Sequence, residues 1–416
     1  MISRGNGYNR VIIIVVVALL VVLAGCAGLD SVRGGPSDQR PAADPQDQST
    51  PGDAQDGSTA APPANGTGDP AAPTSRLDGD GNSTVQPVGP FPIGTSNQGL
   101  TDPTALIAAH LGVLDETSYT VTRAETHSTA DYKYLMGSTL EVQGDRQRLA
   151  VEYAGQSQDI YRADNATPSF IRWQTETGVR YLRDEGDVLF PGESAFFLQS
   201  VLESSEFEFV EQRTVGDRPV FVYSITSFSE SQNLRDATPL DAVDELDGTV
   251  YVRGDGLISG IDVVLTGSDY EGIVTDLEIN EAFSAVGSTT VTEPPWLAEA
   301  HDRAALLSAT LDQGRTAIAI TMEHGDAIPA GSTGYLYLGE ITLETTFEDG
   351  LEPGQSFYVF ESQDGELTVT EVAPTSATIG APVPAEIKDV SLAIFHQEYG
   401  TVYASSLPLG QSTEES

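Results

Sequence analysis

Two segments decide the fold: VGDRPVFVY at residues 215–223 and VYVRGDGLI at residues 250–258. Each places a Gly-Asp dipeptide beside a run of Val, Tyr, Phe or Ile, and this pattern predicts a β-hairpin. Outward from the second turn, Ile261, Val263 and Leu265 occupy alternate positions and would share one face of a sheet. We therefore expect an antiparallel meander in the middle of the chain.

The residues around this meander predict more strands and two helices. Thr101-Asp102-Pro103 is typical of a helix start, and the apolar positions that follow extend the helix to Leu114. A second helix is expected at 194–202. Further strands are expected at 119–123, 149–153, 170–173, 179–182 and 276–283. Residues 99–298 are thus expected to form one α+β domain.

After Trp296 the sequence changes to short β segments separated by turn residues. The expected strands are 317–322, 334–338, 341–345, 357–360, 367–370, 390–395 and 402–405. This spacing predicts an all-β sandwich domain over residues 299–409. A disordered tail is expected at 410–416.

The opening helix, the segment 170-FIRW-173 and the two hairpins at 215–223 and 250–258 resemble the LolA/LppX/LprG-like superfamily of lipoproteins and lipid carriers. The chain is similar in particular to a haloarchaeal lipoprotein family that joins a lipobox, an acidic tether and such a domain. The resemblance implies an antiparallel half-barrel whose concave face is covered by helices. It also implies a space between sheet and helices that can hold acyl chains.

The predicted second helix carries the candidate binding residues Phe196, Phe197, Val201 and Leu202. These side chains could line a hydrophobic groove for a ligand. They could equally fill the space against the sheet, because protein cores are normally packed without large voids. The sequence leaves both alternatives open.

The first residues of the chain predict export and lipidation. Arg4 and Arg10 precede an apolar run that ends in Leu23-Ala24-Gly25-Cys26, the pattern of a signal peptide at 1–25 followed by a lipidated Cys26. The run from 11 to 24 is shorter than the ~20 residues that a membrane-spanning helix needs. The expected location is therefore the extracellular face of the cell membrane, through a lipid anchor.

Residues 26–98 are poor in apolar clusters and rich in Asp, Pro, Gly, Ser and Thr. Such a segment cannot bury enough surface to offset the entropy lost on ordering, so a disordered acidic tether is expected. Asn65 and Asn82 begin glycosylation sequons within it, which makes both of them candidate modification sites.

The excess of acidic residues limits the kinds of molecule that the chain could bind. The chain has 62 acidic against 20 basic residues, a formal net charge of −42. This charge argues against nucleic acid, whose binding depends on Lys and Arg. An acidic surface repels itself at low salt, and molar salt screens that repulsion, so the composition favours a protein from concentrated brine.

No motif for catalysis is present. The five histidines lack metal-ligand spacing, and neither a nucleophile elbow nor a phosphate-binding glycine loop occurs. We therefore expect no enzyme activity, no cofactor and no metal. The favoured hypothesis is a lipid-anchored surface lipoprotein that binds or presents an acyl or isoprenoid ligand. The alternative is a structural or adhesive envelope protein that binds other proteins through its sandwich domain, without a ligand pocket.

Overall fold

The computed structural model describes residues 90–411, apart from 185–190, 313, 340, 376–377, 384–386 and 399. The predicted signal peptide, Cys26, Asn65, Asn82, most of the tether and the last residues of the tail lie outside the described residues. Those expectations stay predictions. Among the described residues, none of the helices combines the length and the apolar character that crossing a membrane requires.

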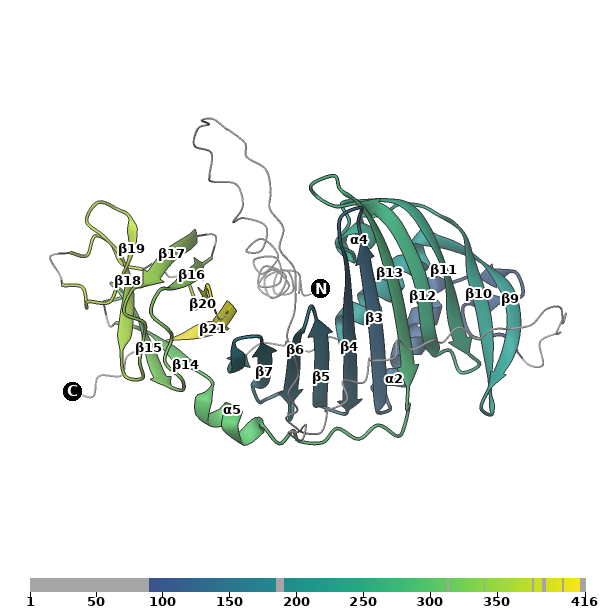
Figure 1. Cartoon of the computed structure of the whole chain (residues 1–416), viewed down its shortest axis with the longest axis horizontal. Coiled ribbons are helices and arrows are strands. Elements are labelled where there is room, and N and C mark those ends of the chain that lie inside the picture. Colours follow the sequence, from purple (N-terminus) through teal and green to yellow (C-terminus); the bar gives the residue numbers. More distant parts are fainter. Residues whose placement is uncertain are drawn as a thin grey trace, which may run out of the picture. The chain divides into compact units, whose positions relative to one another are not determined.

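An eleven-stranded antiparallel sheet is the largest element (Figure 1). Its strand order is β8-β7-β6-β5-β4-β3-β13-β12-β11-β10-β9, so almost every neighbour in space is also a neighbour in sequence. The strands are β3 (Tyr119–Ser128), β4 (Lys133–Gln143), β5 (Arg146–Tyr153), β6 (Gln156–Arg162), β7 (Ser169–Thr175), β8 (Gly178–Asp184), β9 (Ser205–Val215), β10 (Arg218–Phe228), β11 (Ala242–Arg253), β12 (Ile258–Ser268) and β13 (Val274–Ser284).

Both predicted hairpins are confirmed. Val215 pairs with Arg218 across the β9–β10 turn, where Gly216 adopts a φ of 64° that favours glycine. At the β11–β12 turn, the Gly256 amide donates to the Arg253 carbonyl at 2.9 Å. The meander is therefore set by local turn chemistry at both positions.

Helices cover one face of this sheet, which we call the inner face. They are α2 (Pro103–Asp115), α3 (Pro191–Ser204) and α4 (Gln232–Asp236). The helix start predicted at Asp102 is confirmed, because the Ala105 amide donates to its carboxylate at 2.9 Å. The short pair β1 (Thr95–Ser96) and β2 (Gly99–Leu100) precedes α2. An antiparallel sheet with covering helices is the arrangement that the resemblance implied.

The opposite, outer face of β6, β7 and β8 is covered by the segment that contains α5 (Leu297–Arg303). Tyr161, Phe170 and Tyr181 pack there with Trp296 and its neighbours. The Trp296 indole also donates to a carboxylate oxygen of Asp159 at 2.7 Å, so its polar edge is satisfied where it is buried.

The C-terminal region is all-β, as predicted. Its eight strands follow one hydrogen-bonded order, β17-β16-β20-β21-β14-β15-β18-β19, in which only β14 and β21 pair in parallel. A sandwich of two packed sheets therefore stays a prediction. The strands are β14 (Leu306–Leu311), β15 (Ile318–His324), β16 (Ser332–Leu338), β17 (Ile341–Phe347), β18 (Ser356–Glu361), β19 (Leu367–Thr370), β20 (Asp389–His396) and β21 (Gly400–Gln411).

Candidate functional site

The four predicted groove residues divide between the two sides of α3. Phe197, Val201 and Leu202 are at most 2 % exposed and pack in the core between the helix and the sheet, whereas Phe196 is 41 % exposed. Successive helix positions point about 100° apart, and the buried side of α3 includes Phe197, Val201 and Leu202 but not Phe196. The structure thus brings three of the four residues together.

The layer between α3 and the inner face is filled with side chains. Leu198 is fully buried beside Phe197, and Leu106 and Ile107 of α2 belong to the same apolar cluster. The hollow beside α5 and the hollow on the outer face of β11, β12 and β13, both described below, are not lined by the predicted groove residues. A ligand between sheet and helix would therefore have to displace side chains that are now packed.

A charged cluster borders this apolar layer, on the inner face of β3 and β13. Arg123 pairs with Glu125, and its guanidinium lies 3.4 Å from a carboxylate oxygen of Glu281, whose side chain has no exposed area. His127 lies 3.3 Å from the second carboxylate oxygen of Glu125. The guanidinium also stands 4.7 Å from the ring centroid of Phe197, so charged and apolar groups meet directly at α3.

The electrostatics of Glu125 reflect these neighbours. Burial raises its pKa, but the hydrogen bond with His127 and the positive charge of Arg123 outweigh burial, so the pKa of this carboxyl lies below its ordinary value. Two carboxylates, those of Glu125 and Glu281, thus share one guanidinium in a largely dry environment. Arg123 is the cation that the two carboxylates have in common, and removing one partner of a buried ion pair is costly.

Aromatic rings connect this cluster with the end of the sheet. His127 stacks on Tyr134 with ring centroids 4.4 Å apart, and Tyr134 in turn contacts Tyr132 and Tyr153. Tyr132 is 48 % exposed. A continuous row of rings therefore leads from the surface at the β3–β4 turn to the buried ion pairs.

This charged cluster was not predicted from the sequence. A sequence signal for it is nevertheless present in β3. Tyr119 and Val121 start an alternation of inner-face residues, and Arg123, Glu125 and His127 occupy the next three inner-face positions. Three charged or titratable residues that continue an apolar alternation indicate a buried polar site. The partner Glu281 could be known only from the pairing of β3 with β13, and the contact with the Phe197 ring only from the packing of α3 on the sheet.

His110 of α2 is buried among apolar side chains. Its ring accepts a hydrogen bond from the Ile258 amide at 3.2 Å and meets the edge of Phe283 at 4.7 Å. Burial lowers the pKa of His110 to about 4, so the ring is neutral at pH 7. Within the described part of the chain, no group of three His, Cys, Asp or Glu side chains could hold a metal ion.

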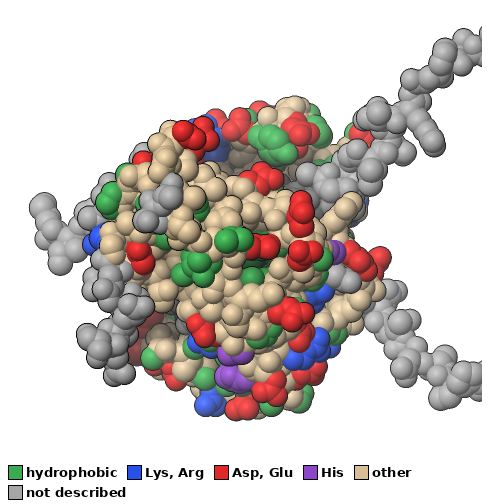
Figure 2. Space-filling view, turned by 90° about the vertical axis from the view of Figure 1, so that its left-hand side faces the viewer, with side chains coloured by type: hydrophobic (Ala, Val, Ile, Leu, Met, Phe, Trp, Pro, Cys, Tyr) green, Lys and Arg blue, Asp and Glu red, His purple; other side chains and the backbone are tan. Residues whose placement is uncertain are grey.

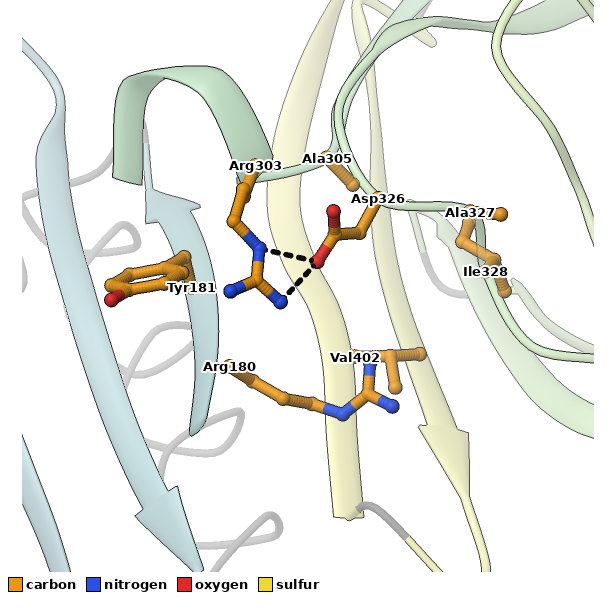
Figure 3. A pocket seen from close by; sticks show the side chains of 8 residues that line it. All are labelled: Arg180, Tyr181, Arg303, Ala305, Asp326, Ala327, Ile328 and Val402. Atoms are coloured by element: carbon orange, nitrogen blue, oxygen red, sulfur yellow. Dashed lines mark hydrogen bonds and ion pairs between the residues drawn. The ribbon is translucent and has the colours of Figure 1, made fainter. Parts of the chain in front are cut away.

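A small hollow lies beside α5, where Arg303 donates to Asp326 at 2.9 Å and its guanidinium lies 5.2 Å from the ring centroid of Tyr181 (Figure 3). Its volume is about 10 Å³, enough for about one water molecule. Arg303 also pairs with Glu299 of the same helix. We interpret this site as a polar contact that holds α5, because it is too small for an organic ligand.

The sequence matches the model of a family described as a "Family of unknown function (DUF7537)" over residues 10–300. The chain belongs to DUF7537. No curated protein matches the sequence. The DUF7537 match includes the whole eleven-stranded sheet, α2 and α3, and thus the charged cluster and the predicted groove residues.

Several solved structures show a distant similarity to this DUF7537 chain. A DUF1329 family protein from Desulfovibrio piger is 10 % identical, covers 46 % of this chain and 93 % of its own, and has a TM-score of 0.19. A putative outer membrane lipoprotein-sorting protein domain from Vibrio parahaemolyticus is 11 % identical, with coverages of 46 % and 97 % and a TM-score of 0.20. A structure of the MucA/MucB complex of Pseudomonas aeruginosa is 13 % identical, covers 68 % of this chain and 99 % of its own, and has a TM-score of 0.22. At these TM-scores the similarity supports no functional argument.

Proposed function

We propose that this chain is a non-enzymatic lipoprotein, anchored through Cys26 on the outer face of a haloarchaeal cell membrane, that binds an amphiphilic ligand between its sheet and α3. The anchor is supported by the signal pattern that ends at Cys26. The brine habitat is supported by the excess of acidic residues, which are spread over the face drawn in Figure 2 with few Lys or Arg among them.

One observation carries the ligand proposal: charged and apolar surfaces adjoin at α3. The Arg123 guanidinium contacts the ring of Phe197, and Val201 and Leu202 continue the apolar surface. A binding site for a lipid needs polar groups that contact the head group and an apolar surface that contacts the hydrocarbon chain. The inner face at α3 offers them side by side.

The bound state requires α3 to move away from the sheet, because its side chains occupy the layer. Moving the helix would expose Phe197, Leu198, Val201 and Leu202, each of which gains about 1.5–3 kcal/mol from burial. The ligand must replace that apolar contact. A long acyl or isoprenoid chain can do so, and a small polar metabolite cannot.

The test is to purify the full chain at molar KCl and analyse it by native mass spectrometry and lipid extraction. We expect bound acyl or isoprenoid molecules and uptake of a fluorescent long-chain fatty acid. Val201→Trp, which overfills the layer, should reduce uptake, whereas Phe196→Trp on the exposed side of α3 should not. Protein that is always empty and takes up no fatty acid would refute the proposal.

The anchor is tested separately with Cys26→Ser. The variant should remain unprocessed or be released into the medium, since the thiol that would carry the lipid is gone. The wild-type chain should stay with the membrane fraction and have a mass that shows loss of residues 1–25. Membrane attachment and mass that do not differ between the two proteins would contradict lipidation.

A further inference from the structure

Exposed apolar side chains concentrate at one end of the eleven-stranded sheet. Of the twelve exposed large apolar side chains among the described residues, six lie there, on β4, β12, β13 and the adjoining turns. They are Tyr132, Leu135, Val264, Tyr270, Ile273 and Val274. Single exposed apolar residues are ordinary, but this clustering typically marks an interaction surface.

Strand register places these residues together. Ser128 of β3 pairs with both Lys133 of β4 and Asp276 of β13, so the β3–β4 turn and the β12–β13 turn lie at the same end of the sheet. Val274 lies two residues before Asp276 and therefore on the same, outer face. We call this surface, formed by the six residues above and the outer-face hollow described next, the turn-end surface.

The hollow has a volume of about 430 Å³ and is lined by β3, β4, β11, β12 and β13. Four carboxylates line it, against one ammonium group, that of Lys133; the carboxylates are Glu245, Asp247, Asp276 and Glu278. No ion pair joins any of these five groups to another described residue. Among the described residues, Asp276 accepts a hydrogen bond from the Thr266 hydroxyl alone, at 2.8 Å.

The negative charge of the turn-end surface favours some binding partners over others. Residues 27–89 of the chain are themselves acidic, and a second copy would present the same carboxylates. At contact, where charges approach to the ~3 Å Debye length of molar salt, an anionic bilayer would still be repelled, and Asp131 and Glu271 add negative charge at the two turns. A partner with Lys or Arg around an apolar centre is complementary in both respects.

We propose that the turn-end surface is a docking site for a cationic, partly apolar segment of another protein. Val264, 44 % exposed between carboxylates, and Tyr270, 74 % exposed at the turn, provide the apolar contact. The four carboxylates of the hollow receive the partner's Lys or Arg side chains. The hollow and its four carboxylates are on the outer face, so the charge contact does not depend on the ligand proposed for the inner face.

The test uses a synthetic peptide of alternating Arg and Val as the probe, with a Glu-Val peptide and lipid vesicles as alternatives. Binding to the full chain is measured by fluorescence anisotropy at about 1 M KCl, where the Debye length is about 3 Å, and at lower salt. We expect the Arg-Val peptide to bind, more tightly at low salt. The Glu-Val peptide and phosphatidylglycerol vesicles should not bind.

Two double variants locate the site. Glu245→Lys with Asp247→Lys should weaken peptide binding by about tenfold at low salt, and by less at about 1 M KCl, because only the charge contact is lost. Tyr270→Ser with Val274→Ser should weaken it by about tenfold at both salt concentrations. The matched control is Glu208→Lys with Val210→Ser, which makes the same kinds of change on the exposed side of β9 and should have no effect.

Three outcomes would overturn the proposal. They are no binding of the Arg-Val peptide to the wild-type chain, equal loss of binding in the β9 control, and vesicle binding that depends on Tyr270 and Val274. The last result would assign the surface to a membrane instead. Circular dichroism of each variant shows whether it has kept its fold, so that a folding defect is not mistaken for lost binding.

Discussion

The two faces of β3 and β13 carry charge in opposite ways. On the inner face, Arg123, Glu125 and Glu281 are paired and almost dry. On the outer face of the same β13, Asp276 and Glu278 are exposed and form no ion pair with another described residue. The comparison shows that an acidic composition does not by itself say what a carboxylate does. The burial and the partners of each carboxylate decide whether its charge mainly affects the stability of the fold or the binding of another molecule.

The largest effect should follow from removing the cation of the inner cluster. Arg123→Leu leaves Glu125 and Glu281 buried without their shared partner, so we expect the free energy of unfolding to fall by about 3–5 kcal/mol. Urea unfolding at constant molar KCl measures it. Replacing all three residues by Leu is the control and should restore most of the loss, because no buried charge is then left unpaired. A loss below about 1 kcal/mol for Arg123→Leu would refute the pairing.

The two adjacent phenylalanines of α3 provide the next contrast. Phe197→Ala should cost about 3 kcal/mol, because it leaves a cavity between helix and sheet. Phe196→Ala should change the stability by less than about 0.5 kcal/mol, since that side chain is largely exposed. The same urea titration compares them. Equal effects would mean that α3 does not present the stated face to the sheet.

The pH dependence of stability should identify His110 as a buried neutral group. Its pKa is 6.5 in the unfolded chain and about 4 in the folded one, so only the unfolded state takes up a proton between these values. The contribution of neutral His110 to the free energy of unfolding is therefore fully present above pH 6.5. At pH 5 the free energy of unfolding should be about 2 kcal/mol lower. Denaturation midpoints across this range measure the slope.

His110→Asn is the control, because its side chain still offers an acceptor to the Ile258 amide but does not titrate. The slope between pH 6.5 and 5 should become shallow in this variant. The carboxyl of Glu125 acts in the same direction but only at lower pH, because its pKa lies below its ordinary value. A wild-type slope that persists in His110→Asn would assign the effect to another group.

Local patterns in the sequence were enough to predict much of the half-barrel. The Gly-Asp turns at 216 and 254–256, the cap at Asp102 and the apolar face of α3 each depend on residues close together in the chain. Strand β4 (Lys133–Gln143) was missed, because only its second half alternates clearly between apolar and polar residues. Strand β14 (Leu306–Leu311) was also not predicted.

The candidate site was less predictable, and the reason is physical. The predicted groove rested on helix periodicity, which places Phe197 correctly but cannot tell a filled layer from an open one. The charged cluster needs Glu281, which lies 158 residues from Arg123 and comes beside it only through pairing of the first and last strands of the sheet's meander. Contacts of that kind are not encoded in local periodicity.

The smallest effect is expected on the outer face, where it should depend on salt. Glu278→Gln removes one of four unpaired carboxylates around the hollow, so at low salt it should stabilise the fold by up to about 0.5 kcal/mol. At about 1 M KCl the repulsion is screened within about 3 Å and the gain should vanish. Urea titrations of Glu278→Gln and Glu125→Gln at both salt concentrations compare the two faces. Glu125 is shielded from ions by burial, so its variant should be destabilised to a similar extent at either concentration, and a strong salt dependence there would remove the distinction between the faces.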